Sequence, residues 1–406
     1  MQPGIVEAEP TTRARSPHPA GAGRLGALYA ATFLVIGIQL PFWPVWLAGR
    51  GLDPQQIAMV FAAAIWAKVA ATPAIGVLAD RLGSYRAVMT GLALLACAGY
   101  GGLWPVAGFG VLLALNVAAG VAQSALIPLG DSITLAAVRE RGLDYGRVRV
   151  WGSIAFVVAA IGGGAALSVM PAMRGGNAVL VLVLLASALL AAACVVLPAG
   201  TGGAAPRLAR RRALRRLIGD RRFRLFVVSI AALQASHQLY YGFGTLYWRH
   251  LGFSNPVIGA LWAEGVVAEI VLFWYGGPLV ARLGPVGLMA AAGIGGIVRW
   301  GLMGVLPGLA AAAALQTLHA LTFGAAQLGA MHFMMRTVPP GAAASAQALY
   351  AALSAGLGSG LVMLGAGALY AEYGGHAYLF MALLSAAGLA GVLRLGMAAR
   401  PIGSTG

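Results

Sequence analysis

The sequence predicts an all-α membrane protein with 12 transmembrane helices, because of its composition, its length and its apolar runs. The 406 residues are 60% hydrophobic and only 9% charged, whereas a soluble globular domain carries about 25% charged residues. The mean hydropathy is +0.84, and the chain has too little polar surface to be soluble in water. Twelve helices of about 20 residues need roughly 240 residues, which fit with short connections. The predicted spans are 25–48, 56–79, 87–105, 109–137, 150–170, 177–198, 225–247, 256–280, 287–306, 309–335, 344–370 and 377–395.

The basic residues are placed as in a membrane protein with both termini in the cytoplasm. The formal net charge is +16, from 27 basic and 11 acidic residues. If the N-terminus is cytoplasmic, the loops and tails on that side hold 22 of the 27 basic residues, the opposite loops hold three, and two lie within spans. This bias is the positive-inside pattern. We therefore expect a multi-pass protein of the cell inner (cytoplasmic) membrane, and the charge does not indicate a nucleic-acid partner.

Two predicted six-helix bundles are joined and flanked by polar or basic segments. Residues 1–23 lack the apolar core of a signal peptide, so we expect a disordered cytoplasmic tail there. The N-terminal bundle covers 24–198 and the C-terminal bundle covers 225–395. Between them, 199–224 contains nine arginines, which predicts a cytoplasmic linker that contacts anionic lipid headgroups. Residues 396–406 are expected to form a cytoplasmic C-terminal tail.

The two bundles contain an internal repeat. Residues 76–83 read GVLADRLG and residues 277–284 read GPLVARLG, so both fit G-x-L-x-x-R-L-G with an offset of 201. The same offset relates Gly51 to Gly252 in the loops before these segments. Parallel repeats of six spans are typical of one transporter fold, in which the substrate binds between the two halves.

The chain resembles the major facilitator superfamily in the loop after the second span. The gating motif of that superfamily is matched by Gly76, Asp80, Arg81, Gly83 and Arg86. Ser84 stands where a basic residue is usual. Asp80 can accept hydrogen bonds from helix N-terminal amides or pair with a nearby arginine, and breaking such a contact would help the cytoplasmic side to open. The alternative is that Asp80 only caps a helix. Ala281 replaces the acid in the second copy, so such a contact belongs to the first half alone.

Ionisable residues inside the spans are functional candidates, because burying a charge in lipid is costly. Glu269 and Arg299 lie 15 residues on either side of Gly284, and Arg299 and His319 lie ten residues on either side of Leu309. Antiparallel helices rise equally from a shared loop, so the three side chains should share one depth near the membrane midplane. They are predicted to form a proton relay, in which Arg299 holds Glu269 ionised until a proton releases the pair. A structural ion pair that only orients the helices is the alternative.

Lys68 and Glu264 are further candidates. Lys68 lies 15 residues before Gly83, the repeat partner of Gly284, so it is the pseudo-symmetric counterpart of Glu269 and should face the cavity near the midplane. Whether Lys68 pairs with Glu269 or Glu264 is left open. Glu264 and Glu269 are about 140° apart around a helix, so they should not share one face. Glu269 is therefore the stronger candidate for proton coupling.

The fourth and fifth spans contain a predicted charge pair. Asp131 and Arg149 are each nine residues from Glu140, the centre of the loop between these spans. Residues equidistant from a tight loop lie level, so we expect the two side chains to meet in a bidentate pair.

The motifs around these residues sharpen the resemblance. The string DYGRVRVWGS at 144–153 is the most specific in the chain, and GIVRWG at 296–301, LYYGF at 239–243 and LH at 318–319 support it. The sequence is similar to the lactose-permease-like branch of the superfamily, and closer still to the phenylpropionate permease (3-phenylpropionic acid transporter) group. The similarity covers the chain from about residue 25.

The resemblance implies roles for the intramembrane charges. The acid and arginine that bind sugar in the lactose permease correspond to Asp131 and Arg149. The proton-coupling acid, arginine and histidine of that permease correspond to Glu269, Arg299 and His319. Its second acid, three residues after the histidine, is replaced here by Thr322. This departure leaves Glu269 as the main acid.

Three residues of the seventh span complete the predicted substrate site, namely His237, Tyr240 and Tyr241. His237 either lines the cavity or packs between helices. Tyr240 and Tyr241 can form a stacking wall for an aromatic substrate. The alternative is that the aromatic residues of this span belong to a belt at the membrane interface.

The sequence lacks the motifs of membrane enzymes and ATP-driven pumps. A G-x-x-x-x-G-K loop cannot occur because the single lysine is Lys68, and the sequence has no H-E-x-x-H motif. Cys97 and Cys194 lie in unrelated spans without metal-ligand spacing. We therefore expect no enzyme activity, no catalytic residue, no metal and no cofactor, with the proton gradient as the driving force.

The charges and the resemblance together predict a secondary active transporter. The favoured function is proton-coupled uptake of an aromatic monocarboxylate such as 3-phenylpropionate by alternating access. Once the two predicted charge pairs form, Lys68 is the spare cation, and a substrate carboxylate would be its natural partner. A proton-coupled sugar or nucleoside symporter is the alternative, followed by drug efflux. The expected partners are a small-molecule substrate, protons and membrane lipid, and we expect the chain to act as a monomer.

Overall fold

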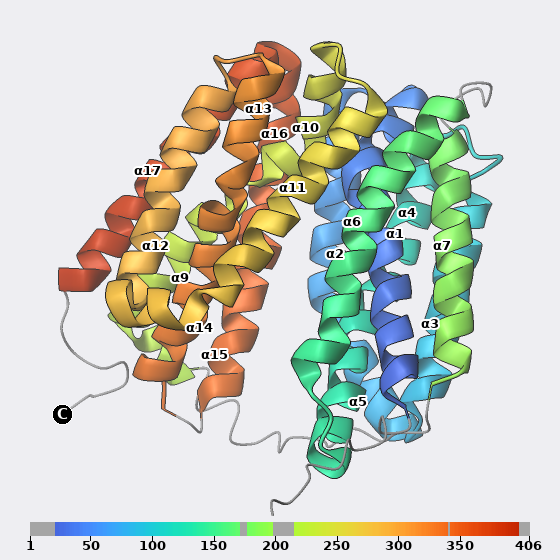
Figure 1. Ribbon diagram of the computed structural model, residues 1–406, viewed down its shortest axis with the longest axis horizontal. Helices are drawn as coiled ribbons and strands as arrows, with labels where there is room; N and C mark the ends of the chain where they lie inside the picture. Colours follow the sequence, from blue (N-terminus) through green and yellow to red (C-terminus); the bar gives the residue numbers. More distant parts are fainter. Residues whose placement is uncertain (1–20, 171–176, 198–214, 340–341, 398–406) are drawn as a thin grey trace, which may run out of the picture.

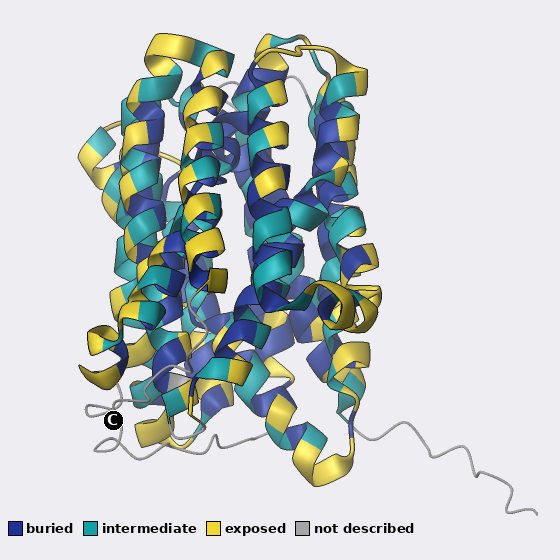
Figure 2. Cartoon of the chain, turned by 90° about the vertical axis from the view of Figure 1, so that its left-hand side faces the viewer, coloured by how far each residue is buried: buried dark blue, intermediate teal, exposed yellow. Residues whose placement is uncertain are grey.

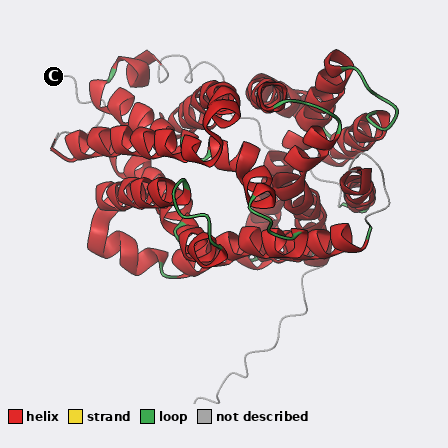
Figure 3. Ribbon diagram, turned by 90° about the horizontal axis from the view of Figure 1, so that it is seen from above, coloured by secondary structure: helices red, strands yellow, loops and turns green. Residues whose placement is uncertain are grey.

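The described part of the chain is helical throughout (Figures 1 and 3). The computed structural model describes residues 21–170, 177–197, 215–339 and 342–397. Within these ranges no β-strand occurs. The predicted tails at 1–23 and 396–406 and the predicted linker at 199–224 lie largely outside the described residues.

The first half of the chain crosses the bundle six times. Its helices are α1 (Ala22–Gly49), α2 (Pro54–Leu82), α3 (Tyr85–Gly102), α4 (Phe109–Ser124), α5 (Leu126–Arg141), α6 (Tyr145–Val169) and α7 (Asn177–Val195). The helices α4 and α5 form one crossing that is interrupted at Ala125. Two of these helices begin at capped ends: Asp53 and Gln56 form a capping box at α2, and Asp144 accepts from the Arg147 amide at α6.

The second half contains interrupted crossings that carry most of the polar residues described below. Its elements are α9 (Arg221–Ala235), α10 (Gln238–His250), α11 (Asn255–Trp274), α12 (Gly276–Met303), α13 (Leu309–Thr317), the π-helix η2 (Ala320–Ala325), α14 (Ala326–Thr337), α15 (Ala343–Tyr350), the π-helix η4 (Ala351–Gly358), α16 (Ser359–Tyr373), the 3₁₀-helix η5 (Gly374–Ala377) and α17 (Tyr378–Met397). The helix α12 turns at Gly284, so its first two turns continue the crossing of α11.

These elements confirm the 12 predicted crossings. By length and composition, nine helical stretches in the described ranges can span a membrane. One of them, Ser345–Met397, has 53 residues and contains two crossings, because it turns at η5. The helix α3 and the α9–α10 pair complete the twelve.

The backbone repeats itself with the offset found in the sequence. Gly51 and Gly252 have φ angles of 84° and 83°, and Gly83 and Gly284 have φ angles of 64° and 65°. A residue with a Cβ is strained at such angles, so each glycine lets the chain leave one helix and turn toward the next. The matching turns confirm the prediction of two pseudo-symmetric bundles.

The two halves pack together at one side of the bundle. We call the side at which α1 begins the terminal side, and the side at which α1 ends the distal side. The halves meet mainly through α6 with α11 and α2 with α16. A Cβ on Gly164 would collide with the Asn255 carbonyl, and one on Gly259 with the Ala160 carbonyl. These close contacts lie toward the distal side, whereas α5 and the α14–α15 pair diverge on the terminal side (Figure 1).

The outer surface of the bundle is apolar. Large side chains such as Val158, Leu185 and Leu383 are exposed there, and exposed residues follow the outward helix faces (Figure 2). Lipid hydrocarbon can cover such a surface, and the helices satisfy their own backbone hydrogen bonds. The protein is a multi-pass membrane protein.

Candidate functional site

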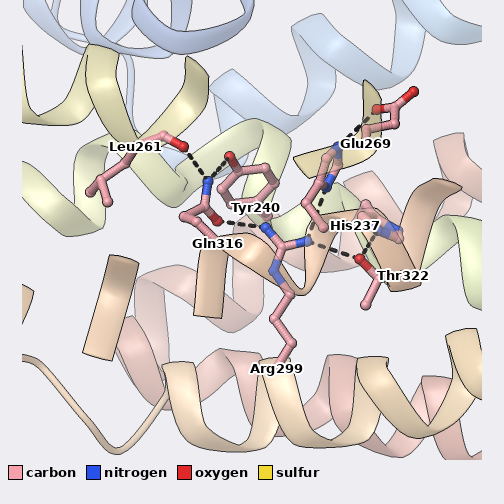
Figure 4. A network of polar contacts seen from close by, with 8 residues as sticks. His237, Tyr240, Leu261, Glu269, Arg299, Gln316 and Thr322 are labelled. Carbon is pink, nitrogen blue, oxygen red and sulfur yellow. Dashed lines mark hydrogen bonds and ion pairs between the residues drawn. The ribbon is translucent and has the colours of Figure 1, made fainter. Parts of the chain in front are cut away.

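A buried polar network in the second half is centred on Arg299 of α12 (Figure 4). Arg299 is fully buried, and its Nη2 donates to Gln316 Oε1 at 2.6 Å. Its Nη1 donates to His319 Nδ1 at 3.1 Å and to Thr322 Oγ1 at 3.0 Å. The guanidinium also lies 4.5 Å from the ring centroid of Trp300. The network thus ties α12 to α13 and η2 through a cation that keeps its charge.

These acceptors lie on one side of the tenth crossing, at the junction of α13 and the π-helix η2. Gln316 precedes it, His319 lies directly before its first residue, and Thr322 lies within it. All three bond the same guanidinium, and each is three residues from the next, a spacing that places neighbours on one helix face. Such a local change of helix type is frequent at functional sites.

Glu269 of α11 joins the network through His319. Its Oε2 lies 3.7 Å from His319 Nε2, and its side chain is 19% exposed. Because His319 Nδ1 accepts from Arg299, a neutral His319 carries its proton on Nε2 and directs it toward Glu269. The structure therefore brings Glu269, Arg299 and His319 together as expected. It corrects the predicted direct contact of Glu269 with Arg299, since the imidazole lies between them.

His237 belongs to this network rather than to a cavity wall. Its Nε2 lies 3.0 Å from Thr322 Oγ1, and its Nδ1 lies 3.2 Å from the Gln234 carbonyl. The side chain is 1% exposed and its ring meets the Trp300 ring edge-on. Of the two roles left open for His237, the structure shows the packing role. Thr322, where the resemblance implied only a lost acid, links His237 to Arg299.

Gln316 is a member of the network that the sequence reasoning missed. Its Nε2 donates to the Tyr240 hydroxyl at 2.8 Å and to the Leu261 carbonyl at 2.9 Å, while its Oε1 accepts from Arg299. The sequence feature that could have indicated Gln316 is its position in an apolar run, one helical turn before His319.

Two adjoining cavities lie between the halves and share the wall formed by Ile36, Leu40 and Tyr241. The α2–α4 compartment has a volume of about 470 Å³ and is lined among others by Lys68, Asn116, Gln123 and Trp43. The α6–α11 compartment has a volume of about 320 Å³ and is lined among others by Arg149, Glu269, His319, Tyr240 and Trp262. Their combined size is within the usual range of small-molecule sites.

Lys68 faces the α2–α4 compartment without a partner. No hydrogen bond or ion pair joins it to any residue in the described ranges, so it pairs with neither Glu269 nor Glu264 there. A third cavity, of about 470 Å³, extends from Lys68 past Thr72 and Pro73 toward the terminal side. The α2–α4 compartment is therefore continued toward the side at which the halves diverge.

The predicted pair of Asp131 and Arg149 is wrong, because tyrosines take the place of the arginine. Asp131 Oδ1 accepts from the hydroxyl of Tyr29 and, at 3.0 Å, from that of Tyr145. Arg149 instead lies over the rings of Phe33, at 4.2 Å, and of Tyr29, at 5.2 Å. Counting residues along two neighbouring helices could not show that Tyr29 of α1 lies between them. Arg149 lines the α6–α11 compartment together with Glu269, whereas Asp131 lines neither compartment.

The remaining candidate residues occupy different surroundings. Glu264 is half-buried and lines neither compartment, as expected from its angle to Glu269. Tyr240 stacks on Trp262 with ring centroids 4.3 Å apart, and Tyr241 lines both compartments. These contacts favour a stacking wall over an interfacial belt for the two tyrosines.

The gating motif forms a compact turn between α2 and α3. Gly83 ends α2 at positive φ, and Asp80 accepts from the Tyr85 hydroxyl at the start of α3. Arg86 Nη1 donates to the Leu197 carbonyl at 3.4 Å, while Gly76 and Arg81 are exposed or partly exposed on α2. The expected contact of Asp80 with an arginine is not formed among the described residues.

The described residues hold no group of three or more His, Cys, Asp or Glu side chains that could bind a metal ion. Cys97 and Cys194 are free thiols.

Comparison with known proteins identifies the family. The sequence model of the MFS_1 like family matches residues 23–382. The chain belongs to this family. The "Probable 3-phenylpropionic acid transporter" of Escherichia coli (strain K12) is 30% identical over 363 residues, which cover 88% of this chain and 93% of that protein. "Maltose permease" of Geobacillus stearothermophilus is 29% identical over 384 residues, covering 92% and 94%.

A solved structure agrees with the family in its fold. The crystal structure of the nucleoside transporter NupG matches with a TM-score of 0.82 at 17% sequence identity, covering 92% of this chain and 99% of that one. This member of the MFS_1 like family is therefore a secondary transporter with the major facilitator fold, and it is not an enzyme.

Proposed function

We propose that this transporter takes up an aromatic monocarboxylate, such as 3-phenylpropionate, together with a proton across the cell inner membrane. The name of the relative from Escherichia coli supports the substrate class. The distribution of basic residues supports a cytoplasmic terminal side, so the conformation described above opens toward the cytoplasm. The proposal requires no cofactor, and a single chain contains all the parts it uses.

The observation that carries the proposal is the unpartnered Lys68 in a cavity with aromatic walls. An isolated buried cation is costly, and an anionic ligand group removes much of that cost. Trp43, Tyr100 and Tyr241 line the same compartment and can contact an aromatic ring. A monocarboxylate with an aromatic ring matches both features.

Proton coupling follows from the charges that line the two compartments. They are the cations Lys68 and Arg149 and the acid Glu269. Protonation of Glu269 makes the cavity more positive by one charge and therefore favours binding of an anion. By linkage, a bound anion favours protonation of Glu269 to the same degree. Proton and carboxylate thus enter together, and release of either one to the cytoplasm favours release of the other.

The Arg299 network supports this exchange without taking part in it directly. Its cation is already bonded to Gln316, His319 and Thr322, so it stays in place when Glu269 changes its charge. His319 positions the carboxyl group of Glu269 at the cavity wall.

Uptake into proteoliposomes tests the proposal. An inward proton gradient should drive accumulation of labelled 3-phenylpropionate, and Glu269→Gln should abolish accumulation while exchange of labelled for unlabelled substrate persists. A neutral amide cannot carry the proton, yet binding and helix motion remain. Glu264→Gln is the matched control, because Glu264 lies on the same helix outside both compartments, and it should keep both activities. Accumulation by Glu269→Gln, or transport of maltose or nucleosides in place of the acid, would contradict the proposal.

A further inference from the structure

The α2–α4 compartment contains a second unpartnered polar group. Asn116 of α4 is only 7% exposed, and its Nδ2 has no hydrogen-bond partner. A buried amide nitrogen without an acceptor costs free energy comparable to a lost hydrogen bond. The side chain lines the compartment although Nδ2 itself is shielded, so a rotation of the amide would turn both N–H groups toward a ligand.

Lys68 and Asn116 lie close together. A Cβ built on Gly120 would lie 3.3 Å from Cε and 3.7 Å from Nζ of Lys68, so the ammonium group lies against α4 at Gly120. Asn116 is four residues before Gly120, which places it on the same helix face, about 6 Å along the axis. The ammonium and the amide thus face the compartment from neighbouring positions.

Three other polar side chains of the compartment already donate hydrogen bonds. The Tyr100 hydroxyl donates to Gln123 Oε1 at 2.7 Å, Thr32 donates to the Leu28 carbonyl, and Ser124 donates to the Val121 carbonyl. Lys68 is the half-buried cation of the lining, and Asn116 is a buried amide whose nitrogen has no partner. Together they offer a positive charge and a planar pair of N–H groups, which suits a group with two oxygen acceptors.

We propose that Lys68 and Asn116 form the subsite for the substrate carboxylate, with Asn116 as a residue that determines specificity for the ionised acid. This inference rests on the proposed transport of a carboxylate. The aromatic ring of the substrate extends toward Tyr241, which is shared with the α6–α11 compartment. The ligand therefore contacts both halves of the transporter, with its charged end held by the first half.

Equilibrium binding to purified protein tests this subsite. The ligands are 3-phenylpropionate, its uncharged amide and hexanoate, and the variants are Asn116→Ala, Lys68→Gln and the double variant. Asn116→Ala should weaken binding of 3-phenylpropionate tenfold or more and leave binding of the amide nearly unchanged. The double variant should lose less than the product of the two single effects, because both side chains hold one carboxylate. Binding of the amide shows that each variant is folded.

Asn177→Ala is the matched control, since Asn177 is a half-buried amide whose Oδ1 lacks a partner and which lines neither compartment. It should bind the acid as the unaltered protein does. Unchanged acid binding by Asn116→Ala, with weakened binding by Lys68→Gln, would overturn the subsite and leave the proposed function intact. Binding of hexanoate alone, with the same dependence on Asn116, would support the subsite and remove the aromatic substrate. Failure to bind any of the carboxylates would overturn both.

Discussion

Lys68 and Glu269 occupy equivalent positions in the two halves, since they are related by the offset of 201, but their surroundings differ. Glu269 is close to His319, and behind it Arg299 is bonded to three side chains. Lys68 has no partner among the described residues, and the nearby amide of Asn116 also lacks one. In the second half both terminal nitrogens of the buried cation are bonded and only its Nε lacks a partner, whereas in the first half neither the ammonium of Lys68 nor Asn116 Nδ2 has a partner among the described residues.

This difference separates two roles that a transporter must combine. A network held by several hydrogen bonds keeps its groups in a fixed geometry, so it suits an acid that must return to the same position after each proton. Open donors carry a desolvation cost that a ligand can remove, so they suit the substrate. We infer that the second half provides proton coupling and that the first half binds the anion.

The largest expected effect is on stability, and it compares the fully buried Arg299 with the half-buried Lys68. Arg299→Met should lower the free energy of unfolding by about 3–5 kcal/mol, because it leaves buried acceptors without their donor. Lys68→Met should leave the stability unchanged or increase it, because it removes a buried charge that has no partner. Thermal unfolding of both variants in detergent measures the contrast. Equal destabilisation by both would show that Lys68 also has a structural partner.

The next effect is on substrate affinity. Lys68→Gln should raise the apparent Kd for 3-phenylpropionate at least tenfold, because the carboxylate loses its counter-charge. It should have little effect on the uncharged amide, which gains nothing from an ammonium group. Competition binding with both compounds measures this. An equal loss for acid and amide would indicate that Lys68 shapes the cavity rather than binding the charge.

The smallest effect concerns Thr322, which links Arg299 to His237. Thr322→Val keeps the volume and removes the hydroxyl, so it should cost about 1–3 kcal/mol of stability. Proton-driven accumulation should persist, because Glu269 and His319 keep their contact. Loss of accumulation in a folded Thr322→Val protein would place Thr322 in the proton route. The assignment of a purely structural role to the Arg299 network would then be wrong.

The fold was predictable because its determinants are local or repeated. The lengths of the apolar runs predicted the membrane crossings. The repeat offset of 201 relates Gly83 to Gly284, and both glycines have positive φ angles in the structure. Counting residues from shared loops also brought Glu269, Arg299 and His319 together. This works where two helices meet at a tight turn, since both rise at the same rate.

The contacts that were missed come from helices that share no loop. Tyr29 of α1 accounts for the failure of the predicted Asp131–Arg149 pair, and it is 102 residues from Asp131. The roles of Gln316 and Asn116 were not predicted, because an uncharged amide in an apolar run is only a weak indication of a functional site. Whether such an amide is bonded or open depends on the packing of several helices, which no count along the chain provides.

The central claim is that the proton on Glu269 and the substrate carboxylate are coupled through the charge of the cavity. The most direct test is the equilibrium affinity for 3-phenylpropionate as a function of pH, in the unaltered protein and in Glu269→Gln. We expect the affinity of the unaltered protein to rise as the pH falls, while the substrate stays ionised. Glu269→Gln should bind 3-phenylpropionate at high pH as tightly as the unaltered protein does at low pH. The affinity of this variant should not change over that pH range. The same pH dependence in both proteins would contradict the account.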